Sequence, residues 1–282
     1  MPSLPNLLRN QAGGPIIGVS WPRSGHHMLV RLLQLYYGPE FGYCDYYSGK
    51  PWVPEIAKCC GKIPCRHGAR IHLTKNHDFK LDVPQIKGAR YLIQYRDFIP
   101  SVVSNFELFI RQGNPDDVAT FRKFASAEFG RYKAFVDKWV TSPFVQDQLV
   151  LDYGTFLEDP QGELRRTLEF MDLSTDIDAD KINAAIAEVD GQKIERTEVK
   201  TMRKSGVHGG RDVHQFRHYS PGLFGEIERL NLARQPVIDL FRTYLGRTPA
   251  EQNMLKLQGF ESLDALEAFI KASEEYRSRQ SS

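Results

Sequence analysis

The sequence predicts an α/β protein with a mostly parallel sheet that is covered by helices on both faces. Four short runs rich in β-branched and other apolar residues are candidate strands, at residues 15–20, 69–74, 89–95 and 148–152. Stretches with the apolar spacing of a helix follow these runs along the chain. Strands that alternate with helices favour a parallel sheet, because each helix returns the chain to the edge where the next strand begins.

The same periodicity gives the expected helices. They span residues 28–37, 101–111, 118–140, 160–171, 178–189, 221–245 and 262–275. Ser262 is the expected N-cap of the last helix, since its hydroxyl can accept a hydrogen bond from the first turn. Residues 192–220 have little apolar periodicity and predict a long loop, and residues 276–282 predict a flexible polar tail. No repeat or low-complexity linker divides the chain, so a single domain over residues 1–282 is expected.

Composition narrows the class of protein. The chain carries 37 basic and 35 acidic side chains, a net charge of +2, which is too balanced for a dedicated nucleic-acid binder. Any anion must therefore be bound by a local cluster of basic groups. The N-terminal residues lack the pattern of a signal peptide, and no run approaches the roughly 20 apolar residues that cross a bilayer. These features predict a cytoplasmic protein without a membrane span.

The four cysteines lie close together in the sequence, at Cys44, Cys59, Cys60 and Cys65. A zinc site and a disulfide are the alternatives to reduced thiols. Zinc is disfavoured because no Cys-x-x-Cys pair is present and adjacent cysteines are awkward ligands for one tetrahedral ion. Reduced thiols are expected, since intracellular cysteines seldom form disulfides.

The first candidate site is the turn after the first strand, where Arg23, Ser24, Gly25, His26 and His27 open a helix. The N–H groups and positive dipole end of a helix start bind phosphate, and Arg23 adds a fixed charge. A Walker A motif would have a lysine and a magnesium-binding hydroxyl where the two histidines stand, which disfavours a metal-dependent NTPase. An ordinary strand-to-helix turn is the alternative.

Arg96 and Ser104 form a second candidate anion site. Arg96 follows the third strand, at the edge of a parallel sheet where ligands bind, and Ser104 lies on the first turns of the next helix. A guanidinium and a hydroxyl can bind one anion together. The alternative is an ion pair between Arg96 and Asp97, with Ser104 only a cap or a surface residue of the helix.

Two further segments carry side chains suited to catalysis or anion binding. Lys75 and His77 follow the second strand, and a histidine beside a hydroxyl can remove its proton near neutral pH. Arg203, Lys204 and Gly206 lie in the long predicted loop, where basic residues are otherwise typical of a solvated surface.

Together these segments resemble the sulfotransferase family. Residues 21–27, Trp-Pro-Arg-Ser-Gly-His-His, are similar to the Tyr-Pro-Lys-Ser-Gly-Thr-Thr loop with which sulfotransferases grip the 5′-phosphosulfate of their donor. Arginine replaces lysine here, and two histidines replace two threonines. The aromatic residue that usually follows the loop is Met28 in this chain. Arg96 with Ser104 matches the family's arginine and serine, eight residues apart, that read the donor's 3′-phosphate.

The other two segments extend the resemblance. Lys75 and His77 match the Lys-Thr-His segment of cytosolic-type sulfotransferases, with asparagine in place of the threonine. Residues 203–206 resemble the Arg-Lys-Gly lid of the family, interrupted by a serine. Tyr153 matches a tyrosine near the adenine.

The resemblance implies a doubly wound fold of the P-loop nucleotide-binding type. It also implies transfer of the sulfuryl group of 3′-phosphoadenosine 5′-phosphosulfate (PAPS) to an acceptor hydroxyl, with the 3′,5′-bisphosphate PAP as product and no metal. Arg23 and Lys75 would stabilise the leaving group, and His77 would be the general base. The residues implied to bind the donor are Arg23, Ser24, Gly25, His26, His27, Arg96, Ser104, Tyr153, Arg203, Lys204 and Gly206.

Two other functions are weighed against this one. A P-loop phosphotransferase or nucleotide kinase would use ATP and Mg²⁺, and the missing lysine and hydroxyl disfavour it. A non-catalytic nucleotide-binding module is disfavoured by His77. The acceptor stays open among phenols, lipids, glycans and natural products, and a homodimer is left open. An aromatic acceptor wall, or simply a core, is expected from Tyr43, Tyr46, Tyr47, Trp52 and Phe79.

Overall fold

The computed structural model describes residues 14–171, 177–191, 212–228, 232, 234–260 and 262–280. The chain forms two compact units, each built from two separate stretches of sequence. The first unit comprises Met1–Arg96 and Phe144–Gly210, and the second comprises Asp97–Pro143 and Arg211–Ser282. The single domain expected from the sequence stays a prediction.

The first unit contains a parallel sheet with the strand order β1-β5-β6. Its strands are β1 (Ile17–Ser20), β5 (Tyr91–Tyr95) and β6 (Leu149–Asp152). They confirm the first, third and fourth predicted strands and the α/β class. All residues of β1 and β5 are buried, whichever way their side chains point. Both faces of the sheet are therefore covered, as in parallel sheets generally.

A small second sheet lies beside β1. It has the order β3-β2-β4 and consists of β2 (Tyr43–Asp45), β3 (Lys50–Pro51) and β4 (Leu73–Thr74). Two single bridges link the region of β4 to that of β1. One joins Ile16, just before β1, to Leu73, and the other joins Val19 to Asn76, just after β4. The second predicted strand, over residues 69–74, was too long. Residues 70 and 71 form a turn instead, in which both N–H groups donate to the carbonyl of His67 at 2.8 Å.

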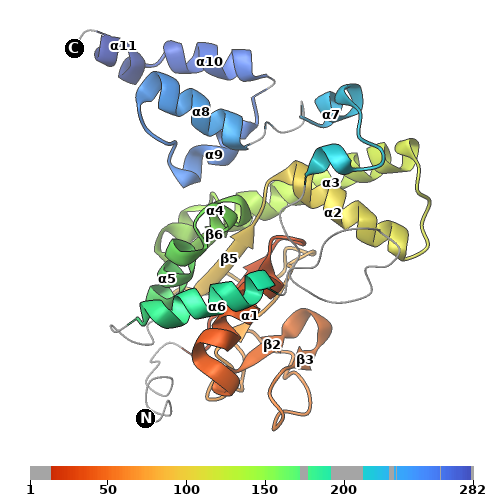
Figure 1. Ribbon diagram of the computed structural model, residues 1–282, viewed down its shortest axis with the longest axis vertical. Coiled ribbons are helices and arrows are strands. Elements are labelled where there is room, and N and C mark those ends of the chain that lie inside the picture. The colour runs from red at the N-terminus through yellow and green to blue at the C-terminus, as the bar shows by residue number, and fades with distance from the viewer. Residues whose placement is uncertain are drawn as a thin grey trace. The chain divides into compact units, whose positions relative to one another are not determined.

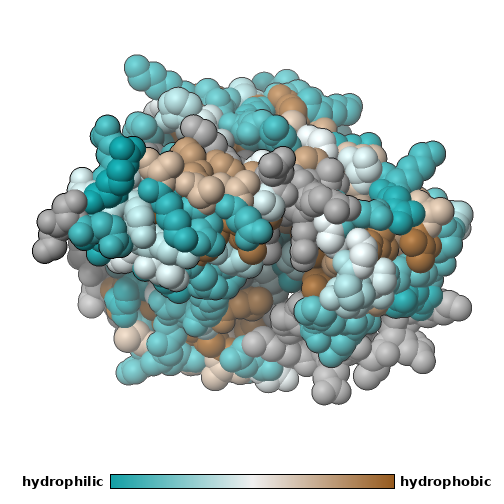
Figure 2. All heavy atoms as spheres, turned by 90° about the horizontal axis from the view of Figure 1, so that it is seen from above, coloured by the Kyte–Doolittle hydropathy of each residue, from teal (hydrophilic) through white to brown (hydrophobic). Residues whose placement is uncertain are grey.

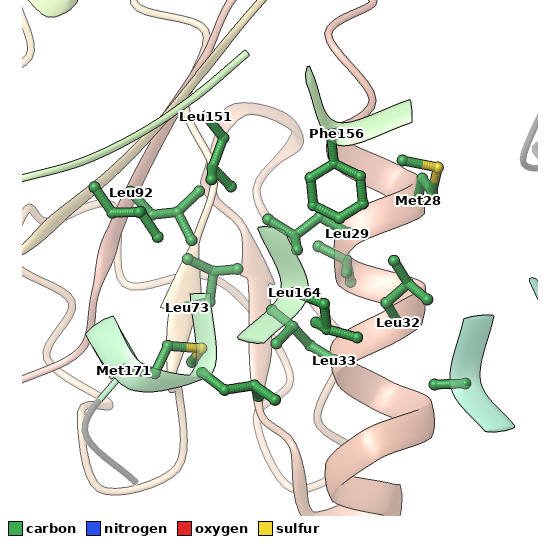
Figure 3. Packing of buried hydrophobic residues seen from close by; sticks show 14 of the residues in the cluster. Met28, Leu29, Leu32, Leu33, Leu73, Leu92, Leu151, Phe156, Leu164 and Met171 are labelled. Carbon is green, nitrogen blue, oxygen red and sulfur yellow. The ribbon is translucent and has the colours of Figure 1, made fainter. Parts of the chain in front are cut away.

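Helices of the first unit cover one face of the parallel sheet. They are α1 (His26–Tyr37), α4 (Tyr153–Glu158), α5 (Pro160–Met171) and α6 (Ala179–Gly191), of which α4 was not predicted. Helices α1 and α6 pack side by side (Figure 1). In the core, Leu92 and Leu151 from the strands face Leu29 and Leu33 of α1, with Leu164 of α5 between them (Figure 3). Burying each such side chain stabilises the fold by about 1.5–3 kcal/mol.

The second unit is helical. Its α-helices are α2 (Phe98–Arg111), α3 (Val118–Trp139), α7 (Pro221–Glu228), α8 (Arg234–Leu245), α9 (Glu251–Gln258), α10 (Leu263–Lys271) and α11 (Glu274–Gln280). The single helix predicted over residues 221–245 was wrong, because two helices occupy that range. Pro236 explains the break, since proline is tolerated only in the first turn of a helix.

The C-terminal prediction also needs correction. Ser262 caps α10 as predicted, accepting from the N–H of Ala265 at 3.1 Å. The helix ends at Lys271, however, and the expected polar tail is largely helical as α11. Ser273 breaks and restarts the helix, because its hydroxyl donates to the carbonyl of Ile270 and accepts from the N–H of Tyr276.

Hydrophilic side chains dominate the face shown in Figure 2, with small hydrophobic areas between them. Within the described ranges, no helix is long and apolar enough to cross a membrane.

Candidate functional site

The loop between β1 and α1 is held against the end of β5. The N–H of Trp21 donates to the carbonyl of Gln94 at 2.8 Å. The hydroxyl of Ser24 donates to the carbonyls of Trp21 at 2.7 Å and of Gln94 at 3.3 Å. Ser24 therefore shapes the loop through its side chain, and the register of β1 on β5, with Ser20 opposite Gln94, fixes where the loop begins.

Gly25 is required at the end of this loop for two reasons. Its φ of 80° lies in the left-handed region, and a Cβ at this position would lie 2.2 Å from a ring carbon of Tyr153. No side chain caps α1, and its first turn contains no acidic residue. The positive end of the α1 dipole is thus uncompensated by its own first turn, which favours an anion there.

Arg96 and Tyr153 meet at the same edge of the sheet. Tyr95 and Asp152 are the last residues of β5 and β6 and lie opposite each other. Arg96 and Tyr153, which follow them, therefore both lie at the carboxyl end of the sheet. The guanidinium carbon of Arg96 lies 4.7 Å from the centre of the Tyr153 ring, a cation–π contact. Because Tyr153 also contacts Gly25, the structure brings the loop, Arg96 and Tyr153 together.

His26 anchors the start of α1 to the strands β5 and β2. Its Nδ1 lies 2.7 Å from Oε1 of Gln94, which can only accept, so Nδ1 carries the proton and donates. Its Nε2 then accepts from the hydroxyl of Tyr43 at 3.0 Å. Burial, followed by the charge of Lys75, lowers the pKa of His26 well below its usual value. Both ring nitrogens of His26 are thus bonded within the protein. If His26 contacts PAPS as predicted, it must do so through its backbone N–H.

Lys75 is a buried cation, with only 4% of its surface exposed. Burial lowers its pKa, Asp45 opposes that shift, and Arg23 adds to it. Asp45 and Arg23 are therefore both within electrostatic range of the Lys75 ammonium. Among the residues that the structure describes, none forms an ion pair with the Lys75 ammonium. Buried charges are normally paired, so this geometry favours a bound anion.

His77 lies two residues after Lys75 and is oriented by β1. Its Nδ1–H donates to the carbonyl of Ser20 at 2.7 Å, which leaves the lone pair on Nε2. Burial lowers its pKa to about 4, and the charge of Lys75 contributes. The ring contacts Tyr47 and Phe79, with centres 4.9 Å and 5.3 Å away.

The aromatic residues expected to form an acceptor wall fall into an exposed group and a buried one. Tyr47, Trp52 and Phe79 are about half exposed, at 54%, 46% and 50%. Trp52 stacks on the exposed ring of His27, at 6.4 Å between centres. Tyr43 is fully buried and belongs to the core, because its hydroxyl is held by His26.

Four other predicted residues lie outside the part of the site described above. Ser104 is buried on α2, in the second unit, whereas Arg96 ends the first unit. Their joint contact with one anion stays a prediction. Arg203, Lys204 and Gly206 lie outside the described residues.

Two residues of the site were missed in the sequence. Gln94 is the one polar residue in the run Tyr-Leu-Ile-Gln-Tyr of β5, and that contrast could have drawn attention to it. Asp45 ends β2, a strand that was not predicted. Its Oδ1 is buried without a hydrogen-bond partner among the described residues, close to Lys75 and His77. No three His, Cys, Asp or Glu side chains in the described ranges converge as metal ligands.

No family model and no curated protein match this chain. Among solved structures, it is similar to the crystal structure of mouse sulfotransferase SULT7A1 complexed with PAP. That likeness has a TM-score of 0.44 and 16% sequence identity, and it covers 76% of this chain and 82% of the mouse chain.

Proposed function

We propose that this protein is a sulfotransferase that transfers the sulfuryl group of PAPS to an acceptor hydroxyl. The observation that carries the proposal is the buried ammonium of Lys75, which no described residue pairs, beside the loop that opens α1. A fixed cation at a helix start is suited to a phosphate-type anion. The absence of the Walker A lysine and hydroxyl from this loop disfavours ATP and Mg²⁺ as its ligand.

The residues present fit such a donor. Gly25 lets the Tyr153 ring pack against the loop, since any Cβ would meet that ring, and Arg96 adds a buried guanidinium on the same ring. In our proposal Arg23 and Lys75 bind the 5′ end of the donor. Arg96, Ser104 and Arg203 bind its 3′-phosphate, and Lys204 and Gly206 belong to the lid.

When bound, the donor supplies the sulfuryl group, and charge builds on the departing phosphate oxygen. Arg23, Lys75 and the N–H groups that open α1 would stabilise that charge, because positioned cations and dipoles need no reorganisation. His77 would remove the acceptor proton through Nε2, the nitrogen that its bond to Ser20 leaves with a lone pair. The exposed rings of Tyr47 and Phe79 beside His77 favour an acceptor with an apolar or aromatic surface around its hydroxyl.

Calorimetric titration with PAP in the presence of EDTA tests the donor site. We expect binding without metal, and a loss of about 2–5 kcal/mol in Lys75→Ala, by analogy with truncating one member of a buried charge pair. Lys80→Ala is the matched control, because Lys80 is exposed only five residues along the chain. Binding of ATP–Mg²⁺ with none of PAP would refute the proposal.

Turnover is tested separately with radiolabelled PAPS and a panel of phenols, aliphatic alcohols and sugars. Labelled product with at least one acceptor class is expected, lost in His77→Ala. PAP binding without turnover on any class would leave only the non-catalytic nucleotide-binding module.

A further inference from the structure

The four cysteines form a cluster that the proposed transfer reaction does not use. Cys44 lies on β2, while Cys59, Cys60 and Cys65 lie in the segment between β3 and β4. All four belong to one small hydrophobic cluster with Val53 and Ile71. All are unoxidised thiols in the structure.

Cys60 and Cys65 are in direct contact. Their sulfur atoms lie 3.6 Å apart, within the distance of a hydrogen bond between the two thiols. A disulfide has an S–S bond of about 2.05 Å, so the two sulfur atoms need to approach by roughly 1.5 Å. Both residues lie outside the strands, and no strand pairing has to break for that movement.

The two thiols differ in their surroundings. Cys60 is partly exposed, and its sulfur accepts a hydrogen bond from the N–H of Arg66 at 3.3 Å. Burial raises the pKa of Cys60, but hydrogen bonds with the backbone of Arg66 and Lys62 and with Cys65 outweigh it and hold that pKa below its usual value. Cys65 is only 8% exposed, and burial raises its pKa to about 11.

An accessible thiol with a lowered pKa, next to a second thiol, is the arrangement found at oxidation-sensitive cysteines. A thiolate is the reactive form of cysteine, and oxidation-sensitive cysteines are accessible, stabilised as thiolates and close to a second thiol that resolves them. Cys60 meets these conditions, and Cys65 is the resolving thiol within reach. Cys44 does not meet them, because it is buried and burial raises its pKa. A shared metal ion is disfavoured, since no three ligands converge among the described residues.

We propose that Cys60 and Cys65 form an oxidation site for hydroperoxides, with Cys60 as the reacting thiol and Cys65 as the resolving thiol. The Cys60 thiolate attacks one peroxide oxygen, the O–O bond breaks, and Cys60 becomes a sulfenic acid. The other oxygen takes up a proton and leaves as water or an alcohol. The Cys65 sulfur then attacks the Cys60 sulfur, which forms the disulfide and releases water. Two electrons pass from the thiol pair to the peroxide.

Peptide mapping can test this site, because trypsin separates the two cysteines. Cleavage after Lys58, Lys62 and Arg66 gives one peptide of residues 59–62 and another of residues 63–66. The full chain is treated with hydrogen peroxide, alkylated, digested and analysed by mass spectrometry. We expect the two peptides to be joined by a bond that dithiothreitol reverses. Because Cys59 shares the first peptide, Cys59→Ser is the matched control and should keep the link, whereas Cys60→Ser should lose it.

Cys65→Ser provides an independent readout. Without the resolving thiol, the Cys60 sulfenic acid should persist and be labelled by dimedone on the peptide of residues 59–62. A link that survives in Cys60→Ser, equal linking in protein unfolded before treatment, or zinc released stoichiometrically on thiol modification would each overturn the proposal. Circular dichroism of every variant before treatment establishes that it is folded.

Discussion

The protonation of His77 sets the pH range in which the proposed base can act. Burial and the Lys75 ammonium lower the pKa of His77 to about 4, so its ring is neutral near pH 7 and Nε2 keeps its lone pair. The same shift makes His77 a weaker base. An anionic donor beside Lys75 would offset the positive charge and raise the pKa again, which would strengthen the base once the donor is bound.

The pH dependence of turnover should reveal this change. A base is active when deprotonated, so activity should be lost as the pH falls through the pKa of His77. We expect the acid limb of kcat/KM for the donor near pH 4, and the acid limb of kcat at higher pH. His77→Ala should lose roughly 10²–10⁴-fold in kcat. His67→Ala, which changes a loop histidine outside the site, should behave as wild type. An unchanged acid limb in His77→Ala would assign the base elsewhere.

Gln94 positions the loop between β1 and α1 through its hydrogen bond with His26. Removing the side-chain oxygen of Gln94 should weaken both the folded state and the binding of PAP. In Gln94→Leu the buried Nδ1–H of His26 loses its acceptor. An unsatisfied buried donor costs about 1–3 kcal/mol, so the free energy of unfolding should fall by that amount and PAP binding should weaken. Urea denaturation and calorimetry measure the two effects.

Tyr43→Phe is the matched control on the other side of the ring. It removes the hydroxyl that donates to Nε2 but leaves no buried N–H without a partner. Its effect should therefore be smaller. Equal stability and equal affinity in Gln94→Leu and wild type would contradict the positioning role.

At the scale of elements, the turn between β1 and α1 depends on close approach as well as on backbone conformation. Gly25→Ala should destabilise the fold by more than the roughly 1–2 kcal/mol expected for a left-handed residue, because its Cβ would also meet the Tyr153 ring. Gly49→Ala isolates the conformational part. Gly49 has a similar backbone, with φ 71° and ψ 17°, and open space around a Cβ.

Thermal unfolding and PAP titration of the two variants make the comparison. We expect Gly25→Ala to lose PAP binding and Gly49→Ala to retain it. If both alanine variants lose the same stability, the contact between Gly25 and Tyr153 does not constrain the loop.

At the scale of the whole molecule, the chain runs from the first unit to the second and back before it ends in the second. Neither unit is a continuous segment, so we expect one cooperative calorimetric transition, with an unfolding enthalpy of about 200 kcal/mol near 60 °C. PAP at 100 times its dissociation constant should stabilise the whole transition by about 2.7 kcal/mol. Two transitions, only one of which shifts with PAP, would indicate that the units unfold independently.

Much of the fold was predictable because its signals are local. Apolar runs marked β1, β5 and β6, and Pro160 marked the start of α5. The breaks at Pro236 and Ser273 were overlooked, although each has a local cause. Strands β2 and β3 are too short to show a periodicity, and the pairing of β2 with the distant β4 has no local signal.

Residue types and spacing were enough to predict the α/β class, the strand–turn–helix that carries Arg23 and Gly25, and the closeness of Lys75 to His77. These features depend on residue type and on spacing over a few positions. Three contacts become visible only in the folded chain: Gln94 and Tyr43 occupy both ring nitrogens of His26, Tyr153 contacts Gly25, and Cys60 meets Cys65. The first two of these join strands and helices far apart in the chain, and the third depends on how a loop folds back, so burial and register rather than local pattern fix them.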